Sequence, residues 1–419
     1  MAVLLTPAQR EQDYYNMLRK PFKKLCRLSF LQPDGSVAFA LDNSPKNPRN
    51  KTFIKEGNLN VNLQNGARRT CSVKLANVNG EYDYNVNNIW FGQEILLEEG
   101  LVLSDGSEFY KKQGVFVINT PQENVQPSER TVTFNLVDKW ANIDGTMYGK
   151  LEGTYEVPTD TNIFEPIEAL LAEDRGNGYP VDRVKPIFTE YYNGKTQTLP
   201  DGTVKNLVES PYTLSVSPSG TYAQVILELA GMVNGLIGYD ASGTLRFDPS
   251  QDDILDSTKP VVWQFSQAET SLIGLTYTVK NSEVYNDFIV VGEKLDDNSQ
   301  PAARAQNLDP SSDTNINLIG RKTFRMDASG FATVQQCRDM AEWKLKRATV
   351  LQKAVSISCS QLFHINEGDL VTIVRTDKKG SPVERHFIQG FSRPLASSGA
   401  MTINCVSTND FPIATVTEW

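Results

Sequence analysis

The chain has 419 residues and a mass of 46.7 kDa, which is long enough to build hydrophobic cores without metals or disulfides. Hydrophobic residues make up 40% and charged residues 22%, which excludes a protein built of apolar membrane helices and argues against a wholly disordered chain. Acidic residues (50) outnumber Lys and Arg (41), so the net charge of −9 disfavours a dedicated nucleic-acid-binding protein. Only two histidines are present, which weakens enzyme hypotheses that require a catalytic histidine.

The cysteines are few and widely spaced, and no Cys-x-x-Cys pair occurs. This pattern disfavours a zinc site and is typical of buried thiols in a reducing cytosol. The N-terminus lacks the basic and apolar regions of a secretion signal, and no apolar stretch reaches the ~18 residues of a membrane span. We expect synthesis in a reducing cytosol and no membrane-spanning segment.

Residues 1–21 are predicted to form an N-terminal helix. Thr6-Pro7-Ala8-Gln9 combines an N-cap, a proline at the first helical position and a capping-box Gln, and Pro21 ends the helix. The segment 10–27 is rich in basic residues. A solvated helix face explains this better than a docking arm for an acidic partner.

The region 22–150 is predicted to be a first β-domain. Its apolar residues alternate with polar ones, and Asn-Gly or Asp-Gly pairs separate the runs. The expected strands are 25–31, 59–63, 71–75, 115–118 and 131–137. Alternation of this kind buries one face of each strand, which indicates an antiparallel sandwich or barrel.

The region 151–257 is predicted to mix helices and strands. A short helix should follow Pro166, and a second helix should begin at Thr221, whose capping partner is Gln224. Between them, 175–211 is rich in Gly, Pro and Tyr and is expected to be a loop, with a role that the sequence does not indicate. A hairpin is expected at 236–247.

The region 258–419 returns to strands and is predicted to be a second β-domain. Its expected strands lie within 274–291 and at 354–359, 370–375, 385–390 and 401–406. A flexible loop is expected at 293–318 and a helix at 333–348, which opens with a third capping box at Thr333. The overall prediction is a mainly β, α+β chain with a few short helices.

A search for catalytic, cofactor and metal motifs gives no candidate site. His364 and His386 lie beside or within strands and are interpreted as surface or core histidines. The adjacent acids Glu98-Glu99 and Asp252-Asp253 point to opposite faces if they lie in strands, so neither pair forms a two-carboxylate site. A calcium loop at 138–145 is rejected because Trp140 stands where an oxygen ligand is needed, and the sequon at Asn50 lacks a secretory context. We therefore expect no catalytic, cofactor-binding or metal-binding residues.

Binding signals are also dispersed. The five tryptophans are spread along the chain and are expected to be core or interface anchors rather than a sugar platform. The segment 321–347 is basic but lacks interleaved aromatic residues, so a solvated helix face or an acidic protein partner is favoured over a nucleic-acid stripe.

The order of short segments resembles the baseplate hub and tail-tip structural proteins of tailed phages. The resemblance covers roughly 25–410. It is carried by the runs 57–61, 65–70, 73–77, 80–82, 226–230, 239–240, 243–249, 283–286, 290–292, 319–320, 367–371, 394–395 and 399–402, and by the helix that begins at Thr333. The first 20 residues and 175–211 lie outside it. The turn residues Gly66, Arg68 and Arg69 are the best candidates for a structurally demanding position, although a tight hairpin with solvated arginines explains them equally well.

The resemblance implies a homotrimer with two similar tube-type antiparallel β-barrels in each chain. The first barrel would be 22–150, and the second would combine 258–292 with 351–415, with the remaining regions outside a six-barrel ring. The implied role is a baseplate hub in the virion that joins the sixfold tail tube to a threefold tip or spike. Its implied partners are the tail tube or distal tail protein, the spike or tip protein and other baseplate proteins, with DNA passing transiently through the lumen. The family brings no catalytic residues.

Two alternatives stay open. One is a distal tail or tube ring protein of another stoichiometry, and the other is a tail-associated cell-wall hydrolase or polysaccharide-binding protein. A channel that passes DNA should repel it, so we expect a net acidic inner wall in an assembled ring.

Overall fold

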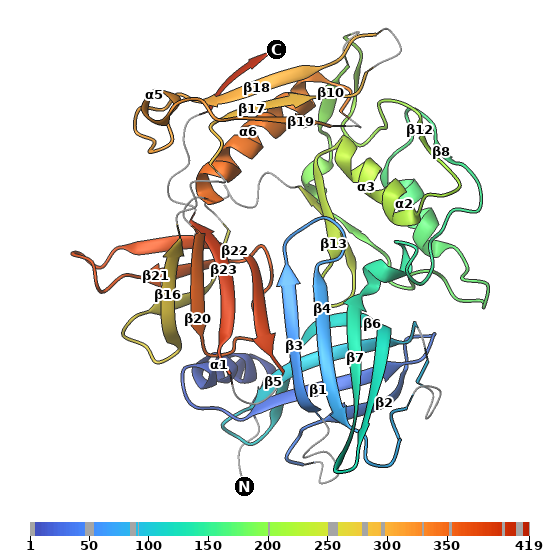
Figure 1. The fold of residues 1–419 in the computed structure, drawn as a ribbon, viewed down its shortest axis with the longest axis vertical. Coiled ribbons are helices and arrows are strands. Elements are labelled where there is room, and N and C mark those ends of the chain that lie inside the picture. Colours follow the sequence, from blue (N-terminus) through green and yellow to red (C-terminus); the bar gives the residue numbers. More distant parts are fainter. Residues whose placement is uncertain are drawn as a thin grey trace.

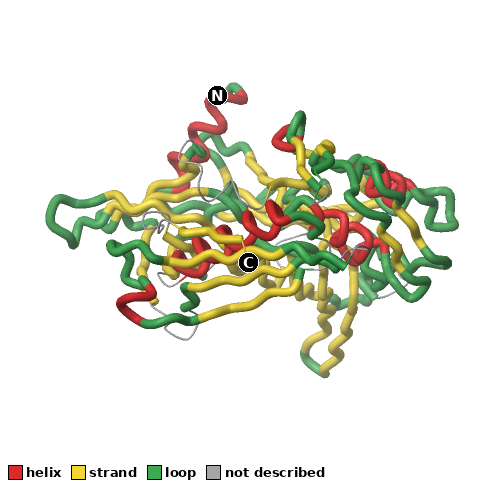
Figure 2. The backbone as a smooth tube through the Cα atoms, turned by 90° about the horizontal axis from the view of Figure 1, so that it is seen from above, coloured by secondary structure: helices red, strands yellow, loops and turns green. Residues whose placement is uncertain are grey.

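The computed structural model describes residues 5–46, 54–83, 89–90, 92–199, 202–249, 259–278, 284–294, 298–328, 331–351, 354–395, 399–407 and 414–418. Helix α1 (Pro7–Leu18) begins with the predicted capping box, in which Thr6 and Gln9 exchange hydrogen bonds. It buries Tyr14 and Leu18 in the largest hydrophobic cluster. Seen from above, α1 lies on one side of the strand layers and a strand hairpin extends on the other (Figure 2).

The first β unit follows α1 and consists of seven strands. They are β1 (Lys24–Leu31), β2 (Val37–Asp42), β3 (Ile54–Asn62), β4 (Arg69–Ala76), β5 (Glu94–Val102), β6 (Glu108–Gln126) and β7 (Glu129–Asp138). They pair in the order β3-β4-β7-β6-β5-β1-β2. The long strand β6 bends, because it pairs with β5 along its first part and with β7 along its second.

The second β unit repeats this order with strands from distant parts of the chain. Its strands are β15 (Val261–Ser266), β16 (Leu272–Thr278), β20 (Ala354–Cys359), β21 (Leu370–Val374), β22 (Val383–Pro394) and β23 (Met401–Ser407). They pair as β16-β20-β23-β22-β21-β15, which corresponds to β3-β4-β7-β6-β5-β1 of the first unit. One difference is that β15 runs parallel to β21, whereas β1 runs antiparallel to β5.

The two units stand side by side and form one continuous sheet (Figure 1). The join is an antiparallel ladder between β3 and the end of β22, with Asn62 opposite Gly390 and Asn58 opposite Pro394. The hydrophobic cluster under this sheet contains residues of both units. The expected mainly β, α+β fold class is therefore confirmed, and the two units share a sheet instead of standing as separate sheets.

A mixed region with its own hydrophobic cluster lies beside the β units, drawn in green in Figure 1. It contains η1 (Lys139–Asn142), β8 (Tyr155–Val157), α2 (Phe164–Ala172), β9 (Ile187–Phe188), η2 (Glu190–Tyr192), β10 (Thr196–Thr198), β11 (Val204–Asn206), β12 (Leu214–Val216), α3 (Tyr222–Met232), β13 (Gly235–Tyr239) and β14 (Leu245–Pro249). The predicted helices after Pro166 and Thr221 and the hairpin at 236–247 are confirmed. The segment 175–211 is not only a loop, because it contains β9, η2, β10 and β11.

A four-stranded sheet crosses the top of the molecule in Figure 1, with helix α6 packed on it. Its elements are β17 (Asp287–Val291), β18 (Ala302–Asn307), α5 (Ile316–Ile319), β19 (Thr323–Asp327), α6 (Val334–Leu351) and β24 (Ala414–Glu418). The strands pair in the order β19-β17-β18-β24. The capping box of α6 is confirmed, since Thr333 and Gln336 exchange hydrogen bonds of 3.0 and 3.1 Å.

Two expectations for this part of the chain were wrong. The run Phe288–Val291 does not join the second β unit, because β17 pairs with β18 and β19 and packs against α6. The segment 293–318 is not a flexible loop throughout, because it contains β18 and the start of α5. The buried side chain of Asn307 holds the polar turn after β18, donating to Ser312 and Thr314 at 2.8 Å each.

Candidate functional site

Eight neighbouring strands form a wall with one apolar face and one polar face. We call the strands β16-β20-β23-β22-β3-β4-β7-β6 the strand wall. Burial alternates along β3, β4, β7, β20 and β23, so one face of the wall packs on the core and the other is left open to solvent. The open face is lined by uncharged amides and hydroxyls: Asn58, Asn60, Thr70, Ser72, Thr133, Asn135, Thr276, Thr278, Ser356, Ser358, Ser392, Thr402 and Asn404. The alternate positions of β3 and β4 also hold Glu56 and Lys74, whose charged atoms lie 3.8 Å apart.

The two halves of the strand wall match in register as well as in strand order. A β-bulge interrupts the β6–β7 ladder between Ile118 and Thr120, and another interrupts β22–β23 between Ile388 and Gly390. A second pair of bulges lies between Ile54 and Glu56 in β3–β4 and between Leu272 and Gly274 in β16–β20. Following the ladders from the first pair of bulges to the second aligns β6, β7, β4 and β3 with β22, β23, β20 and β16, in that order. The two units are therefore a structural repeat.

The ladders fix the residue equivalences of this repeat. Ile118 of β6 corresponds to Ile388 of β22, and Leu136 of β7 corresponds to Cys405 of β23. One strand further along, Cys71 of β4 corresponds to Val355 of β20, and Leu59 of β3 then corresponds to Tyr277 of β16. Within this alignment Ser72 falls on Ser356 and Asn135 falls on Asn404.

A buried ionic cluster locks the join between the two units. Glu99 of β5 lies between Arg393 of β22, with N–O distances of 2.6 and 2.8 Å, and Lys24 of β1 at 2.6 Å. All three side chains are almost completely buried. Burial by itself raises the pKa of Glu99, but Arg393 and Lys24 outweigh it and hold that pKa below its ordinary value. The carboxylate is therefore ionised, and its role is to neutralise two buried cations.

The arginines of the 65–69 turn lie at a second junction, where both β units meet the mixed region. Gly66 has a φ of +91°, which favours glycine, and its N–H donates to the carbonyl oxygen of Ile237 at 2.9 Å. Arg68 and Arg69 are buried, and both contact the carboxylate of Glu367. The interpretation of these arginines as solvated was wrong, because the partner carboxylate comes from a loop that no local pattern points to.

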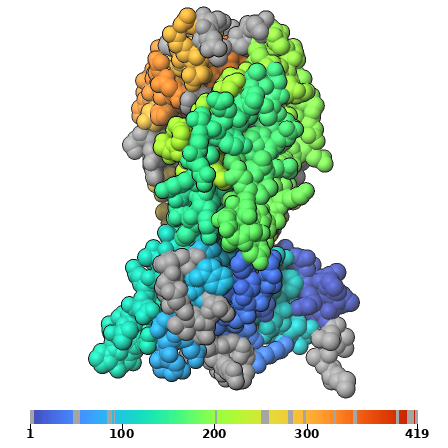
Figure 3. Space-filling view, turned by 90° about the vertical axis from the view of Figure 1, so that its right-hand side faces the viewer, coloured from blue at the N-terminus to red at the C-terminus, as the bar shows by residue number. Residues whose placement is uncertain are grey.

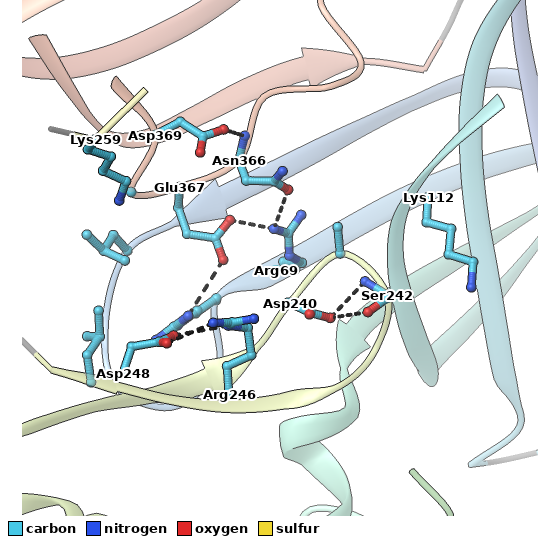
Figure 4. Close-up of a pocket in the computed structure, with 15 residues that line it drawn as sticks. Arg69, Lys112, Asp240, Ser242, Arg246, Asp248, Lys259, Asn366, Glu367 and Asp369 are labelled. Carbon is cyan, nitrogen blue, oxygen red and sulfur yellow. Dashed lines mark hydrogen bonds and ion pairs between the residues drawn. The ribbon is translucent and has the colours of Figure 1, made fainter. Parts of the chain in front are cut away.

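A polar cavity of about 490 Å³ opens at this second junction (Figure 4). Its four labelled carboxylates have partners within the protein. Glu367 contacts Arg69, and Asp248 accepts a hydrogen bond from Arg246 at 2.9 Å. Asp369 accepts the N–H of Asn366 at 2.7 Å, and Asp240 accepts the N–H of Ser242 at 2.8 Å. Burial raises the pKa of Asp369 to about 6. The cavity is lined by charges of both signs, and its carboxylates are held by arginines, backbone N–H groups or a hydroxyl, which is typical of a structural joint between domains.

The other residues considered in the sequence lie in structural positions. Glu98 and Glu99 point to opposite faces, Glu98 toward Arg27 and Glu99 into the ionic cluster. The side chain of Asp138 accepts backbone N–H groups of Arg68, Arg69 and Trp140, which is a capping role. Asp252, Asp253, Asn50 and Trp419 lie outside the described residues.

His386 is buried and His364 is partly buried, and desolvation lowers the pKa of each. His364 lies 3.2 Å from the hydroxyl of Tyr14 and packs against Tyr15 and Trp263. Among the described residues, no three or more His, Cys, Asp or Glu side chains gather to hold a metal ion. No described helix is both long enough and apolar enough to cross a membrane.

The basic segments are engaged within the chain. In the first segment Arg19, at the end of α1, pairs with Glu269 of the second β unit, and Arg27 pairs with Glu98 inside the first. In the second, Arg325 pairs with Asp327 and Lys346 pairs with Glu342. Trp140, Trp263 and Trp343 are buried, as expected of core anchors.

No protein-family model matches the sequence, and no curated protein matches it either. Solved structures do match the fold. The tail protein from Neisseria meningitidis MC58 superposes with a TM-score of 0.58 at 9% identity, over 93% of this chain and 98% of that chain. The 43 kDa tail protein of prophage MuSo2 from Shewanella oneidensis gives 0.56 at 11% identity, over 91% and 98%. Prophage tail protein gp18 from Listeria monocytogenes EGD-e gives 0.51 at 9% identity, over 93% and 95%. Nearly the whole of this chain thus has the fold of these tail proteins, two of which are prophage proteins, in agreement with the family that the order of its sequence segments resembles.

Proposed function

We propose that this protein is a structural hub of a phage or phage-like tail baseplate and that it works as a homotrimer. The observation that carries the proposal is the structural repeat, in which two β units of one chain share strand order and register and pair edge to edge. Three copies would supply six equivalent units. A ring of six such units matches the sixfold symmetry that the family resemblance implies for a tail tube.

The insertions of the two units differ, and this difference supports the role of an adaptor. In the first unit, β3 and β4 are joined by the short turn 63–68. In the second unit, the equivalent strands β16 and β20 are separated by 279–353, which carry β17–β19 and α6. A trimer therefore has six similar wall segments but three large insertions, which is how a sixfold tube and a threefold spike or tip would meet on one protein.

The open face of the strand wall is the proposed lining of a DNA channel. The opposite face is committed to the core, so this face is the one available to a ring interior. On this assignment the lining is neutral and polar, in place of the acidic wall expected from repulsion of DNA, because amides and hydroxyls occupy the alternate positions. Uncharged side chains hold DNA weakly, since the strong part of nucleic-acid binding comes from cations that neutralise phosphates.

The proposed location is the baseplate or tip of the virion tail, after synthesis in the host cytoplasm. The proposed partners are the tail tube or distal tail protein on one side and a spike or tip protein on the other, with further baseplate proteins around them. The role is structural and not catalytic. The carboxylates of the junction cavity are engaged with cations or backbone N–H groups, which supports this view.

The decisive experiment is light scattering coupled to size exclusion over a range of concentrations, with negative-stain images of any rings. A mass three times that of the 46.7 kDa chain supports the hub. A hexamer would instead support a distal tail ring, and a protein that stays monomeric at every concentration would count against the hub. Purified cell wall incubated with the protein should release no sugar or peptide, and release would support the hydrolase alternative.

A further inference from the structure

Each molecule leaves two ends of the strand wall without a strand beside them in the described residues. At one end, β16 pairs with β20 on one side only. At the other, the last part of β6 pairs with β7 on one side, while its ladder with β5 ends at Val117. Both edges are exposed, and the β6–β7 hairpin projects from the body of the molecule (Figure 3). Exposed strand edges are sites where another strand adds readily.

The structural repeat shows how the equivalents of these two edges pair within one chain. The strand equivalent to β16 is β3, and the segment equivalent to the end of β6 is the end of β22. These two equivalents are the pair that joins the units within one chain, with Asn60 opposite Ser392 and Leu59 opposite Arg393. The join continues to Leu395, whose N–H donates to the carbonyl oxygen of Gly57 at 2.9 Å.

We infer that β16 of one copy pairs antiparallel with the end of β6 of a second copy, in the register of the β3–β22 join. The repeat places Thr278 opposite Gln122, Tyr277 opposite Glu123 and Thr276 opposite Asn124 of the second copy. This inference rests on the proposed ring and names the strands that close it. The partner is a second copy of this chain, because the two edges are complementary to each other.

One exposed apolar side chain supports this pairing. Val125 of β6 is 68% exposed, although it is paired with Arg130 in the β6–β7 ladder. Its equivalent in β22 is Leu395, which is only 1% exposed because β3 and the shared core cover it. Pairing with β16 would place Val125 opposite Leu275 of the other copy, just as Leu395 lies opposite Gly57. The burial of apolar surface would then stabilise the contact.

Charge agrees with the same register. Inside the chain, Arg393 reaches across the join to Glu99 of β5. Glu123 is the equivalent of Arg393. The equivalent of Glu99 is Arg375, which continues β21 and whose N–H donates to the carbonyl oxygen of Pro382 at 3.0 Å. The pair is therefore repeated with its signs exchanged, so that Glu123 of one copy would meet Arg375 of the next. Arg375 already stacks on Tyr277 at 4.6 Å from the ring centroid, directly beside the proposed position of Glu123.

Disulfide trapping tests the register. The double variant Thr278→Cys/Gln122→Cys places thiols on directly opposed residues of two copies, where Cβ atoms in such ladders are about 4.5–5.5 Å apart. Asn60→Cys/Ser392→Cys is the matched positive control, since these residues are already opposed within one chain. Thr278→Cys/Gln126→Cys is the negative control, because it keeps the same strand and face but shifts the thiol by about 13 Å. The five native cysteines are buried and should not contribute.

The expected result is a covalent species larger than one chain for Thr278→Cys/Gln122→Cys, and none for the shifted pair. Mixing the two single variants should give crosslinked dimers. Each single variant oxidised alone is the control, and any dimer that it forms slowly by symmetric pairing appears in its own lane. A matched pair that crosslinks no better than the shifted pair overturns the inference, provided that the positive control is oxidised. Light scattering then separates the two failures. A trimer without matched crosslinks leaves the ring standing with other edges, whereas a monomer removes the ring as well.

Discussion

Replacing Glu99 by Gln tests the role of the buried ionic cluster at the join. The variant is nearly isosteric, so it changes the charge with little change in packing. In the native protein the Glu99 carboxylate faces both Arg393 and Lys24, and the exposed fraction of each of these three side chains is at most 1%. The Glu99→Gln variant leaves two buried cations without a counter-charge, whereas Lys24→Met leaves one cation paired with one carboxylate.

The expected loss of stability follows from this imbalance of buried charge. Removing one partner of a buried pair costs about 3–5 kcal/mol because an uncompensated charge stays buried. We expect Glu99→Gln to lie at the top of that range and Lys24→Met well below it. Glu98→Gln is the matched control, since Glu98 is the adjacent residue on the opposite face and forms only a 3.5 Å pair with partly exposed Arg27. Such a pair is worth about 1 kcal/mol or less.

Denaturant unfolding followed by tryptophan fluorescence measures these differences, and the pH dependence adds an internal check. The pKa of Glu99 is lowered in the folded protein, so its stabilising contribution is present above its ordinary pKa of 4.5 and is lost as pH falls through the folded value. The gap between the native protein and Glu99→Gln should therefore shrink in acid. The reasoning fails if Glu99→Gln is no more harmful than Glu98→Gln, or if Lys24→Met is equally damaging.

Three further predictions concern other parts of the molecule. Burial lowers the pKa of His364 from its ordinary 6.5 to about 4, so the unfolded chain binds more protons than the folded protein between these pH values. The free energy of unfolding should therefore fall as pH drops from 6.5 to 4. The His364→Gln variant should flatten this part of the stability profile, and an unchanged slope would contradict the reasoning. A Cβ at Gly390 would clash with the carbonyl oxygen of Val61, so Gly390→Ala should cost roughly 1–3 kcal/mol at the join, while Gly153→Ala, with open space around it, should leave the unfolding midpoint unchanged. Glu123→Arg should reduce the assembled fraction in light scattering, and adding Arg375→Glu should restore part of it; assembly that ignores both changes would argue against the exchanged pair.

The local patterns of the sequence predicted most elements of the fold. Alternation of apolar residues and Asn-Gly turns marked the hairpins of the first β unit, and the three Thr-x-x-Gln segments marked the starts of α1, α3 and α6. These features depend on neighbours in the chain, so a single sequence contains the information. The resemblance to phage tail proteins also followed from segment order, and the shared fold confirms it.

Contacts between residues far apart in the chain were harder to predict from the sequence. The run Phe288–Val291 is buried on both faces, and such a run fits either sheet equally well, so its pairing with β19 was not foreseeable. Arg68 and Arg69 follow a tight turn and look solvated, since Glu367 lies almost 300 positions further along the chain. The register match between β6 and β22 depends on bulges, which only the ladders reveal.

The ion pair at the join has a consequence for the geometry of assembly. Because the first unit contributes the anion at the internal join and would contribute the anion again at the external contact, like ends of two molecules cannot be matched by a twofold axis. In the inferred contact, association is head-to-tail, and a heterologous contact of this kind either closes into a ring or extends into a filament. The angle between the two β units, set at the join of β3 and β22, decides between these outcomes. A change that alters this angle should therefore convert closed particles into filaments even though every contact is retained.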